Sequence, residues 1–293
     1  MELIKLIRIK HWVKNSFLFM PLFFAGEILE TVHYFPLALG FVAFGLVASA
    51  IYVVNDLKDV ENDRIHPKKR FRPLAAGTVS IQTAYLLIPL LVLGGLGLAY
   101  YLEVKFAFVL LLYFAMNLAY TMGLKKISIL DIIIVSIGFV LRIKAGSIIS
   151  DTPLSEWIII MVFLLALFMA IAKRRDDIII KESSGQDMRA ASKKYSLDYL
   201  NIALSLISGV IIVSYLMYTL SPDVISRIGT YRIFYTTLFV IAGVLRYLQI
   251  AIVENNTGSP TSILYRDRFI QLVILAWILS FYLLIYFKDL ILF

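Results

Sequence analysis

Long apolar stretches recur along the whole chain, and they restrict it to one class of fold. Nine of them are long enough for a helix to cross about 30 Å of hydrocarbon, near residues 15–31, 35–55, 79–102, 104–122, 128–149, 154–172, 198–220, 230–252 and 269–290. With 60% hydrophobic residues and a mean hydropathy of +0.86, the composition exceeds what a water-soluble surface permits. The sequence therefore predicts an all-α integral membrane protein with nine transmembrane helices in a single domain spanning residues 1–293.

Positive charges distinguish the two sides of the predicted bundle. With a cytoplasmic N-terminus, 22 of the 28 Lys and Arg residues fall on the cytoplasmic side. Basic residues collect on that side of membrane proteins, so we predict a multi-pass plasma-membrane protein with its N-terminus inside and its C-terminus outside. The net charge of +8 belongs to this asymmetry and does not indicate nucleic acid binding. Because the chain has no cysteine, disulfides and thiolate metal sites are excluded.

A dense run of acids follows the second apolar stretch. Asp56, Asp59 and Asp63 are spaced three and four residues apart, which puts their carboxylates on one face of a helix beside Asn55. Each neighbouring pair repels by about 3 kcal/mol, so the group needs a cation. Oxygen ligands favour Mg²⁺, which carboxylates commonly hold together with the phosphates of a ligand. The alternative interpretation is a solvated acidic end of a helix.

Three charged segments are predicted on the cytoplasmic face, together with a short group at 265–268. Residues 1–14 have the pattern of an amphipathic helix lying among lipid headgroups, and charged loops are predicted over 55–78 and 173–197. Simple anchoring and the positive-inside bias are the alternative explanations for these charges. As phosphate ligands, the sequence offers Lys14, Asn15, Lys68, Lys69, Arg70, Arg72, Lys173, Arg174, Arg175, Arg266 and Arg268.

Two charges lie within the fifth predicted span on nearly the same face. Asp131 precedes Arg142 by eleven residues, or roughly 16 Å along a helix axis, so each needs a partner of its own. Arginine inside a membrane is costly without such a partner, and we therefore predict that Arg142 contributes to substrate binding. Lys144 points elsewhere and lies near the outer end, where snorkelling outward explains it.

The motif at 55–63 resembles the Asn-Asp-x-x-Asp-x-x-x-Asp signature of the UbiA superfamily of intramembrane prenyltransferases. The likeness extends over nearly the whole chain, through 12–15, 48–77, 167–174 and 266–268. These further stretches resemble the branch of the superfamily that uses phosphoribosyl diphosphate as donor. Where that branch has Lys-Arg-x-x-Glu, this chain has Asp177, whose shorter side chain keeps the charge but reaches less far.

This resemblance implies Mg²⁺-dependent transfer of 5-phosphoribosyl from phosphoribosyl diphosphate to a polyprenyl, decaprenyl-like phosphate at the cytoplasmic side of the membrane. The residues implied as metal ligands are Asn55, Asp56, Asp59 and Asp63. The phosphate ligands named above other than Lys68 and Arg175, together with Arg142, Asp177 and Tyr195, are the implied substrate contacts. The surplus of bases suits two phosphorylated ligands. Two alternatives remain: transfer of an isoprenoid chain to an aromatic or other small acceptor, and a non-enzymatic transporter. Against transport, the acids lie at a membrane face and not at its midplane.

Overall fold

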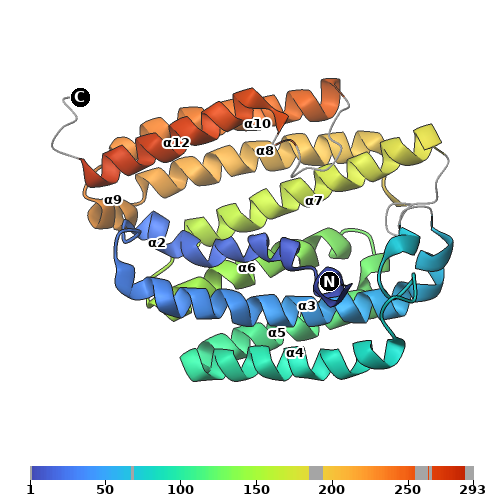
Figure 1. The fold of residues 1–293 in the computed structure, drawn as a ribbon. Coiled ribbons are helices and arrows are strands. Elements are labelled where there is room, and N and C mark those ends of the chain that lie inside the picture. Colours follow the sequence, from blue (N-terminus) through green and yellow to red (C-terminus); the bar gives the residue numbers. More distant parts are fainter. Residues whose placement is uncertain (1, 67–68, 185–193, 255–262, 264–265, 288–293) are drawn as a thin grey trace. The chain divides into compact units, whose positions relative to one another are not determined.

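The computed structural model describes residues 2–66, 69–184, 194–254, 263 and 266–287, and the regular elements in these ranges are all helices (Figure 1). Lys68, residues 185–193 of the second predicted loop, and the C-terminus at Phe293 lie outside the described residues. Within the described ranges, eight helical segments are long and apolar enough to cross a membrane: 31–65, 81–102, 104–122, 130–150, 156–180, 197–220, 232–253 and 268–286. The predicted all-helical membrane fold is confirmed.

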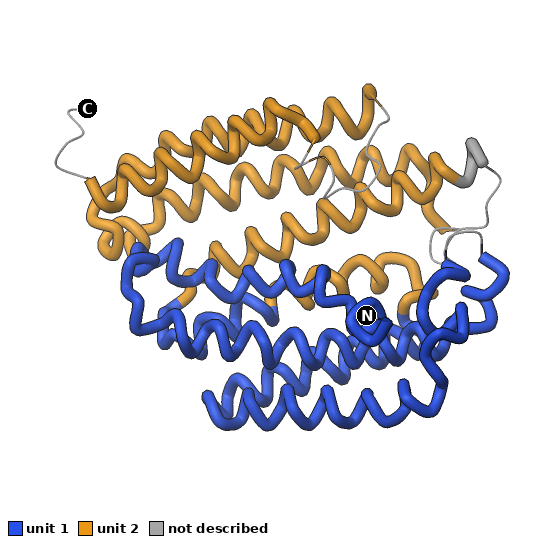
Figure 2. The backbone as a smooth tube through the Cα atoms, in the orientation of Figure 1, with its two compact units in different colours: residues 1–124, 141–153 blue, residues 125–140, 154–293 orange. Residues whose placement is uncertain are grey.

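The chain divides into two compact units, which Figure 2 distinguishes by colour. Unit 1 contains residues 1–124 and 141–153, and unit 2 contains residues 125–140 and 154–293. One long helix, α6 (Leu130–Ser150), contributes residues to both units.

Unit 1 is built around the long helix α3 (Tyr34–Ile65). Helices α4 (Ile81–Leu102) and α5 (Val104–Met122) pack against it and against each other (Figure 1). Gly95 permits a close approach of α4 to α3, because a Cβ at this position would lie 2.8 Å from the carbonyl oxygen of Ala43. The acidic motif is therefore carried on a helix whose apolar part is fixed by two neighbours.

The N-terminal segment forms three short helices, of which the first two pack on α3 and the third packs on the second. These are α1 (Glu2–Ile7), the 3₁₀ helix η1 (Ile9–Phe19) and α2 (Met20–Ala25). Trp12 donates from Nε1 to Ser49 Oγ at 3.0 Å, and Ser49 Oγ donates to the carbonyl of Ile7 at 2.7 Å. The predicted span at 15–31 is thus a 3₁₀ helix followed by a short α-helix that ends at Gly26 (φ 79°), and it is not among the eight long segments.

Both predicted charged loops begin later than expected. Helix α3 continues through the acidic motif to Ile65 and ends where His66 is extended (φ −81°, ψ 133°). His66 precedes Pro67 in the sequence, and a residue before proline disfavours helical geometry. Helix α7 (Glu156–Ser184) likewise continues past Lys173. The 3₁₀ turn η3 (Lys69–Phe71) follows the first motif.

Unit 2 is an assembly of long helices around its own apolar core. Helix α7 packs against α8 (Leu197–Leu220), and α10 (Thr237–Leu248) packs against both α8 and α12 (Arg268–Tyr286). Shorter elements complete it: α9 (Pro222–Ile228), the 3₁₀ helix η6 (Arg232–Thr236) and the π-helical turn η7 (Gln249–Val253). The core is formed by apolar side chains that include Phe168, Leu200, Leu204, Tyr247 and Ile250.

Candidate active site

Two aspartates of the acidic motif share one arginine in unit 1. Asp56 and Asp63 are seven residues apart on α3, which is close to two helical turns, so they project from the same side of the helix. Arg72 donates from Nη1 to Asp56 Oδ1 at 3.1 Å and to Asp63 Oδ2 at 2.6 Å. Both carboxylates are only 2% exposed. A single nitrogen atom therefore joins two buried carboxylates.

A second arginine reaches the same site from the N-terminal segment. Arg8 donates from Nη2 to Asp56 Oδ1 at 2.5 Å, and its guanidinium lies 5.0 Å from the centre of the Tyr52 ring. The backbone of Arg8 is left-handed (φ 53°), and it separates α1 from η1. The sequence indicated only headgroup anchoring for this residue, because a contact across 48 positions leaves no local pattern.

This donor set fits a hard divalent cation. Asp56 and Asp63 offer oxygen ligands, and the cationic nitrogen of Arg72 shows that one positive charge can sit between them. Asn55 and Asp59 are half-buried on the same helix. Among the described residues, no group of three or more His, Asp or Glu side chains is assembled as a metal site. The arginines hold the carboxylates that the sequence assigned to Mg²⁺.

Lys58 fixes the motif helix from another direction. Its Nζ donates to the carbonyls of Thr121 and Met122 at 2.9 and 2.7 Å, which are among the last carbonyls of α5. A lysine at a helix C-terminus satisfies carbonyls that have no partner within the helix. The motif residue Lys58 is therefore structural and holds α3 against α5.

Arg142 has partners of its own, as predicted. Nε donates to Asn15 Oδ1 at 3.2 Å and Nη2 donates to the hydroxyl of Tyr113 at 2.7 Å. The guanidinium lies 5.1 Å from the centre of the Phe44 ring and 4.9 Å from that of Tyr113. Arg142 is 5% exposed and Asn15 is 1% exposed. The structure thus brings together two of the predicted substrate contacts, Asn15 and Arg142, in unit 1.

Lys14 precedes Asn15 on η1 and is half-buried. Burial, and then the positive charges of Arg142 and Arg8, lower the pKa of Lys14 to about 8. At a pH slightly above 7, part of the Lys14 population is therefore deprotonated and carries no charge.

Unit 2 contains a second group of acids and bases. Arg174 on α7 donates from Nε to Asp131 Oδ2 at 2.6 Å and from Nη1 to Asp177 Oδ2 at 3.2 Å. Tyr195 donates to Asp131 Oδ1 at 2.9 Å and accepts from the amide of Ile129 at 2.5 Å. Burial raises the pKa of Tyr195 to about 12. Arg174 and Tyr195 are thus joined through Asp131, and Asp177 is joined to them through Arg174.

Next to this group, α7 buries Arg175 and Asp176, of which the sequence singled out only Arg175. Arg175 donates from Nε to Asn201 Oδ1 on α8 at 2.7 Å. Asp176 is 5% exposed and Tyr247 is 4% exposed, and Asp176 Oδ2 and the Tyr247 hydroxyl have no hydrogen-bond partner among the described residues. The sequence predicted a mixed, solvated loop here. The continuation of α7 as a helix explains why these side chains are buried.

The remaining predicted contacts are exposed bases. Lys69 and Arg70 lie on η3 in unit 1, whereas Lys173, Arg266 and Arg268 lie in unit 2. Asp267, which lies between Arg266 and Arg268 in the sequence, caps α12 by accepting a hydrogen bond from the amide of Ile270 at 2.8 Å. Hydrogen bonds from Arg246 lower the pKa of Asp267.

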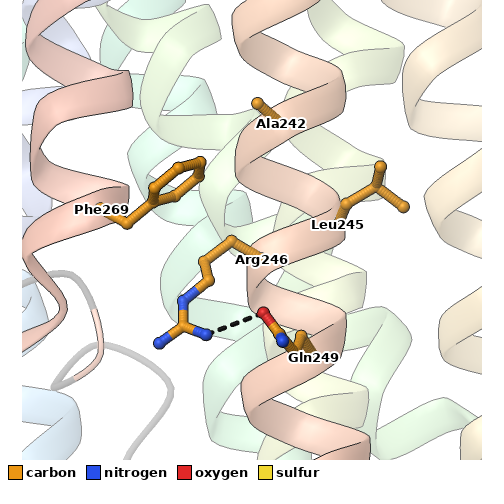
Figure 3. Close-up of a pocket in the computed structure, with 5 residues that line it drawn as sticks. All are labelled: Ala242, Leu245, Arg246, Gln249 and Phe269. Carbon is orange, nitrogen blue, oxygen red and sulfur yellow. Dashed lines mark hydrogen bonds between the residues drawn. The ribbon is translucent and has the colours of Figure 1, made fainter.

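A groove of about 530 Å³ lies beside Arg246, and Figure 3 shows the side chains that line it. Its lining consists of Ala242, Leu245, Arg246, Gln249 and Phe269. Arg246 donates to Gln249 at 2.8 Å and to Asp267 at 2.7 Å. These bonds fix the guanidinium at the polar end of a mostly apolar groove.

The chain is similar to known membrane enzymes over nearly its full length. The model of the UbiA prenyltransferase family matches residues 17–273. A decaprenyl-phosphate phosphoribosyltransferase of Mycolicibacterium smegmatis is 36% identical over 297 residues, covering 98% of this chain and 93% of the relative. The enzyme of the same name from Corynebacterium glutamicum is 34% identical over 290 residues, covering 97% and 86%. The structure of a UbiA homolog from Archaeoglobus fulgidus bound to GPP and Mg²⁺ superimposes with a TM-score of 0.71 at 19% identity, covering 97% of this chain and 99% of that one. The last similarity concerns the fold.

Proposed function

This chain belongs to the UbiA prenyltransferase family, and from that premise we propose that it transfers 5-phosphoribosyl from phosphoribosyl diphosphate to a polyprenyl phosphate, with release of diphosphate. The observation that carries this proposal is the similarity, over nearly the whole chain, to phosphoribosyltransferases of two organisms. Membership of a family of transferases removes the transporter as an alternative.

The acid and arginine group of unit 1 supports the chemistry. Asp56 and Asp63 would hold Mg²⁺, with Asn55 and Asp59 as the further ligands that the motif offers. The bound metal ion supplies positive charge that stabilises the departing diphosphate. Buried carboxylates suit this task, because their interaction with a cation is less weakened by water.

The basic residues orient the two phosphorylated ligands. Arg72 presents a planar fork that matches phosphate oxygens, and Lys14 adds a further donor in unit 1, where the buried Arg142 and Asn15 are bonded to each other. In unit 2 the exposed bases Lys173, Arg266 and Arg268 are the corresponding candidates. Holding donor and acceptor in line places much of the catalysis in positioning and electrostatics.

The proposed reaction needs little help from a general base. The bond from ribose C1 to the diphosphate oxygen breaks, and a bond from C1 to an oxygen of the lipid phosphate forms on the opposite face with inversion. A phosphate acceptor is already ionised near neutral pH. Consistent with this, His11, His33 and His66 are the only histidines of the sequence, and none is required as a base.

The proposal includes the orientation of the chain in the membrane. We assign the N-terminus and the active site to the cytoplasmic side of the plasma membrane and the C-terminus to the outside, with the segment near 15–31 as a ninth crossing. A reporter fused after Phe293 is expected outside and one inserted at 181–190 is expected inside. Detection of both reporters in the cytoplasm contradicts this arrangement.

The decisive assay follows labelled ribose phosphate from phosphoribosyl diphosphate to a polyprenyl phosphate, using purified protein in detergent with Mg²⁺. Transfer with release of diphosphate is the expected result. A prenyl diphosphate offered with an aromatic acceptor serves as the parallel reaction, because the similar fold from Archaeoglobus fulgidus was solved with GPP. Folded protein that performs only the parallel reaction is an isoprenoid transferase, and the proposal fails.

A further inference from the structure

Two arginines bind the motif carboxylates from segments that flank α3 in the sequence. Arg8 comes from the break between α1 and η1, and Arg72 comes from the segment after η3. The side chains of Arg8 and Arg72 are 19% and 26% exposed, whereas that of Asp56 is 2% exposed. The bases thus reach solvent while the acids do not, so an incoming ligand meets the guanidinium groups first.

The same oxygens of Asp56 and Asp63 serve the arginines and are the candidate metal ligands. Arg8 and Arg72 both bind Asp56 Oδ1. Desolvated carboxylates require a neutralising cation, and these arginines provide one from within the chain. A metal ion at the same oxygens must therefore displace at least part of this bonding, because the two cations repel each other and compete for the same lone pairs.

A metal-bound diphosphate offers the arginines a replacement. Guanidinium groups bind phosphate oxygens in the same forked geometry as carboxylate oxygens. When a metal ion takes the carboxylates, the diphosphate that accompanies it brings new anionic oxygens to the same place. The exchange keeps each charge paired throughout, and no bond other than hydrogen bonds and metal contacts changes.

We infer that Arg8 is a counter-ion that changes partner during the reaction cycle: it binds Asp56 while the donor is absent, and it binds a donor phosphate once a metal ion occupies Asp56. This inference rests on the proposed function for its metal-bound diphosphate. Arg8 is then a substrate-binding residue in addition to those that the sequence identified.

The surrounding contacts restrict the exchange to the side chain of Arg8. The carbonyl of Ile7 is held by Ser49, and Trp12 binds the same serine from the other side of the break. Leu6 is fully buried in the apolar cluster that contains Val53 and Val60 of α3. With the backbone fixed on both sides, a rotation of the long Arg8 side chain is sufficient to pass from carboxylate to phosphate.

Two titrations of metal-free protein in detergent test the inference, and neither measures turnover. The first adds Mg²⁺ alone and records its affinity by calorimetry. Because Arg8→Gln removes a competing cation, we expect Mg²⁺ to bind about tenfold more tightly than to the unaltered protein. The second adds phosphoribosyl diphosphate with saturating Mg²⁺. Here Arg8→Gln removes a phosphate contact, and we expect about tenfold weaker binding.

The matched control is Lys10→Gln, which removes one positive charge from an exposed position two residues away. It is expected to leave both affinities unchanged. Arg8→Lys keeps the charge without the fork and serves if Arg8→Gln does not fold. It should shift both affinities in the same opposed directions as Arg8→Gln, by a smaller factor.

A rise in Mg²⁺ affinity together with a fall in phosphoribosyl diphosphate affinity distinguishes a change of partner by Arg8 from its other possible roles. If both affinities fall, Arg8 only maintains the fold; if both rise, it only blocks the site; and if Mg²⁺ affinity does not change, it does not compete with metal. Each of these results overturns the inference. If the unaltered protein binds Mg²⁺ but not phosphoribosyl diphosphate, the proposed function fails, and the Mg²⁺ titration still decides whether Arg8 competes for the carboxylates.

Discussion

The two units use the same pairing of aspartate with arginine in different settings. In unit 1, Asp56 and Asp63 are buried, but their partners Arg8 and Arg72 keep 19% and 26% of their side chains exposed. In unit 2, both members are buried, since the side chains of Arg174 and Asp131 are 3% and 0% exposed. An arginine that reaches solvent can exchange its partner for a ligand, whereas one enclosed by protein cannot do so without opening the fold.

The two groups also differ in the elements that carry their arginines. Arg8 and Arg72 of unit 1 belong to segments outside the long helices, where a side chain can turn without disturbing helix packing. In unit 2, Arg174 is part of α7, and Asp131 is part of α6. The hydroxyl of Tyr195 also fixes Asp131. We therefore expect the first group to control turnover and the second group to control stability, and the following substitutions test that division.

The largest effect is expected from Asp56→Asn in unit 1. Loss of a metal-binding carboxylate removes transition-state stabilisation of about 4 kcal/mol, which corresponds to about a thousandfold in rate. The melting temperature should change little, because the remaining amide still accepts a hydrogen bond and the arginines are partly solvated. Initial rates and thermal unfolding in detergent measure both effects. Turnover at the unaltered rate with Mg²⁺ present contradicts a metal site at this position.

Asp131→Asn in unit 2 should have the opposite profile. Breaking a buried ion pair by neutralising one partner costs about 3–5 kcal/mol, so we expect a clear fall in the free energy of unfolding. Asp198→Asn provides the control, because Asp198 is an exposed acid in the first turn of α8. Chemical denaturation followed by tryptophan fluorescence reports the change. An unaltered stability together with lost activity would break the division, because it would place the second group in ligand binding.

The acidic group of unit 1 was easier to predict from the sequence than the ion pair of unit 2. A spacing of seven residues on α3 is enough to place Asp56 and Asp63 together, since helical periodicity is a local property. The nature of the motif and the long apolar spans were therefore predictable. The partner of Asp131 was not, because Arg174 lies 43 positions away and follows a charged boundary that looked like the start of a loop.

The contact between Arg8 and Asp56 could not be predicted either, because it also joins residues that are far apart in the sequence. The basic and apolar pattern of residues 1–14, with Trp12 among its apolar members, predicted a helix lying among lipid headgroups. In the structure Leu6 is fully buried and Trp12 binds Ser49. Apolar residues of an amphipathic segment face either lipid or protein, and only tertiary packing decides between them.

An intermediate effect is expected from the exposed bases of unit 2. If Arg268 contacts a phosphate of donor or acceptor, Arg268→Ala should cost about 1.5–3 kcal/mol of charge-assisted hydrogen bonding, or about ten- to a hundredfold in kcat/KM. The melting temperature should stay unchanged because Arg268 is exposed. Lys105→Ala, an exposed base at the start of α5, is the matched control. A normal kcat/KM would remove Arg268 from the site and leave phosphate binding to other bases.

The smallest effect concerns pH and arises in unit 1. The pKa of Lys14 is lowered by burial and by the charges of Arg142 and Arg8 to about 8, from an ordinary value of 10.5. Between these two values the unfolded chain binds more protons than the folded one, so this group makes the folded state more stable as the pH rises through that window. Ligand binding should change in the opposite direction, because at pH 9 only about a tenth of Lys14 remains charged.

We therefore expect KM for a phosphorylated substrate to rise by up to about tenfold between pH 7 and pH 9. Lys14→Arg should abolish this rise, since arginine stays protonated throughout the range. Tyr195 of unit 2 contributes no titration there, because burial raises its pKa to about 12 and its hydroxyl continues to donate to Asp131. Measurement of KM against pH for both proteins decides the matter. If the two profiles coincide, the pH dependence of substrate binding has another source and Lys14 does not contact a phosphate.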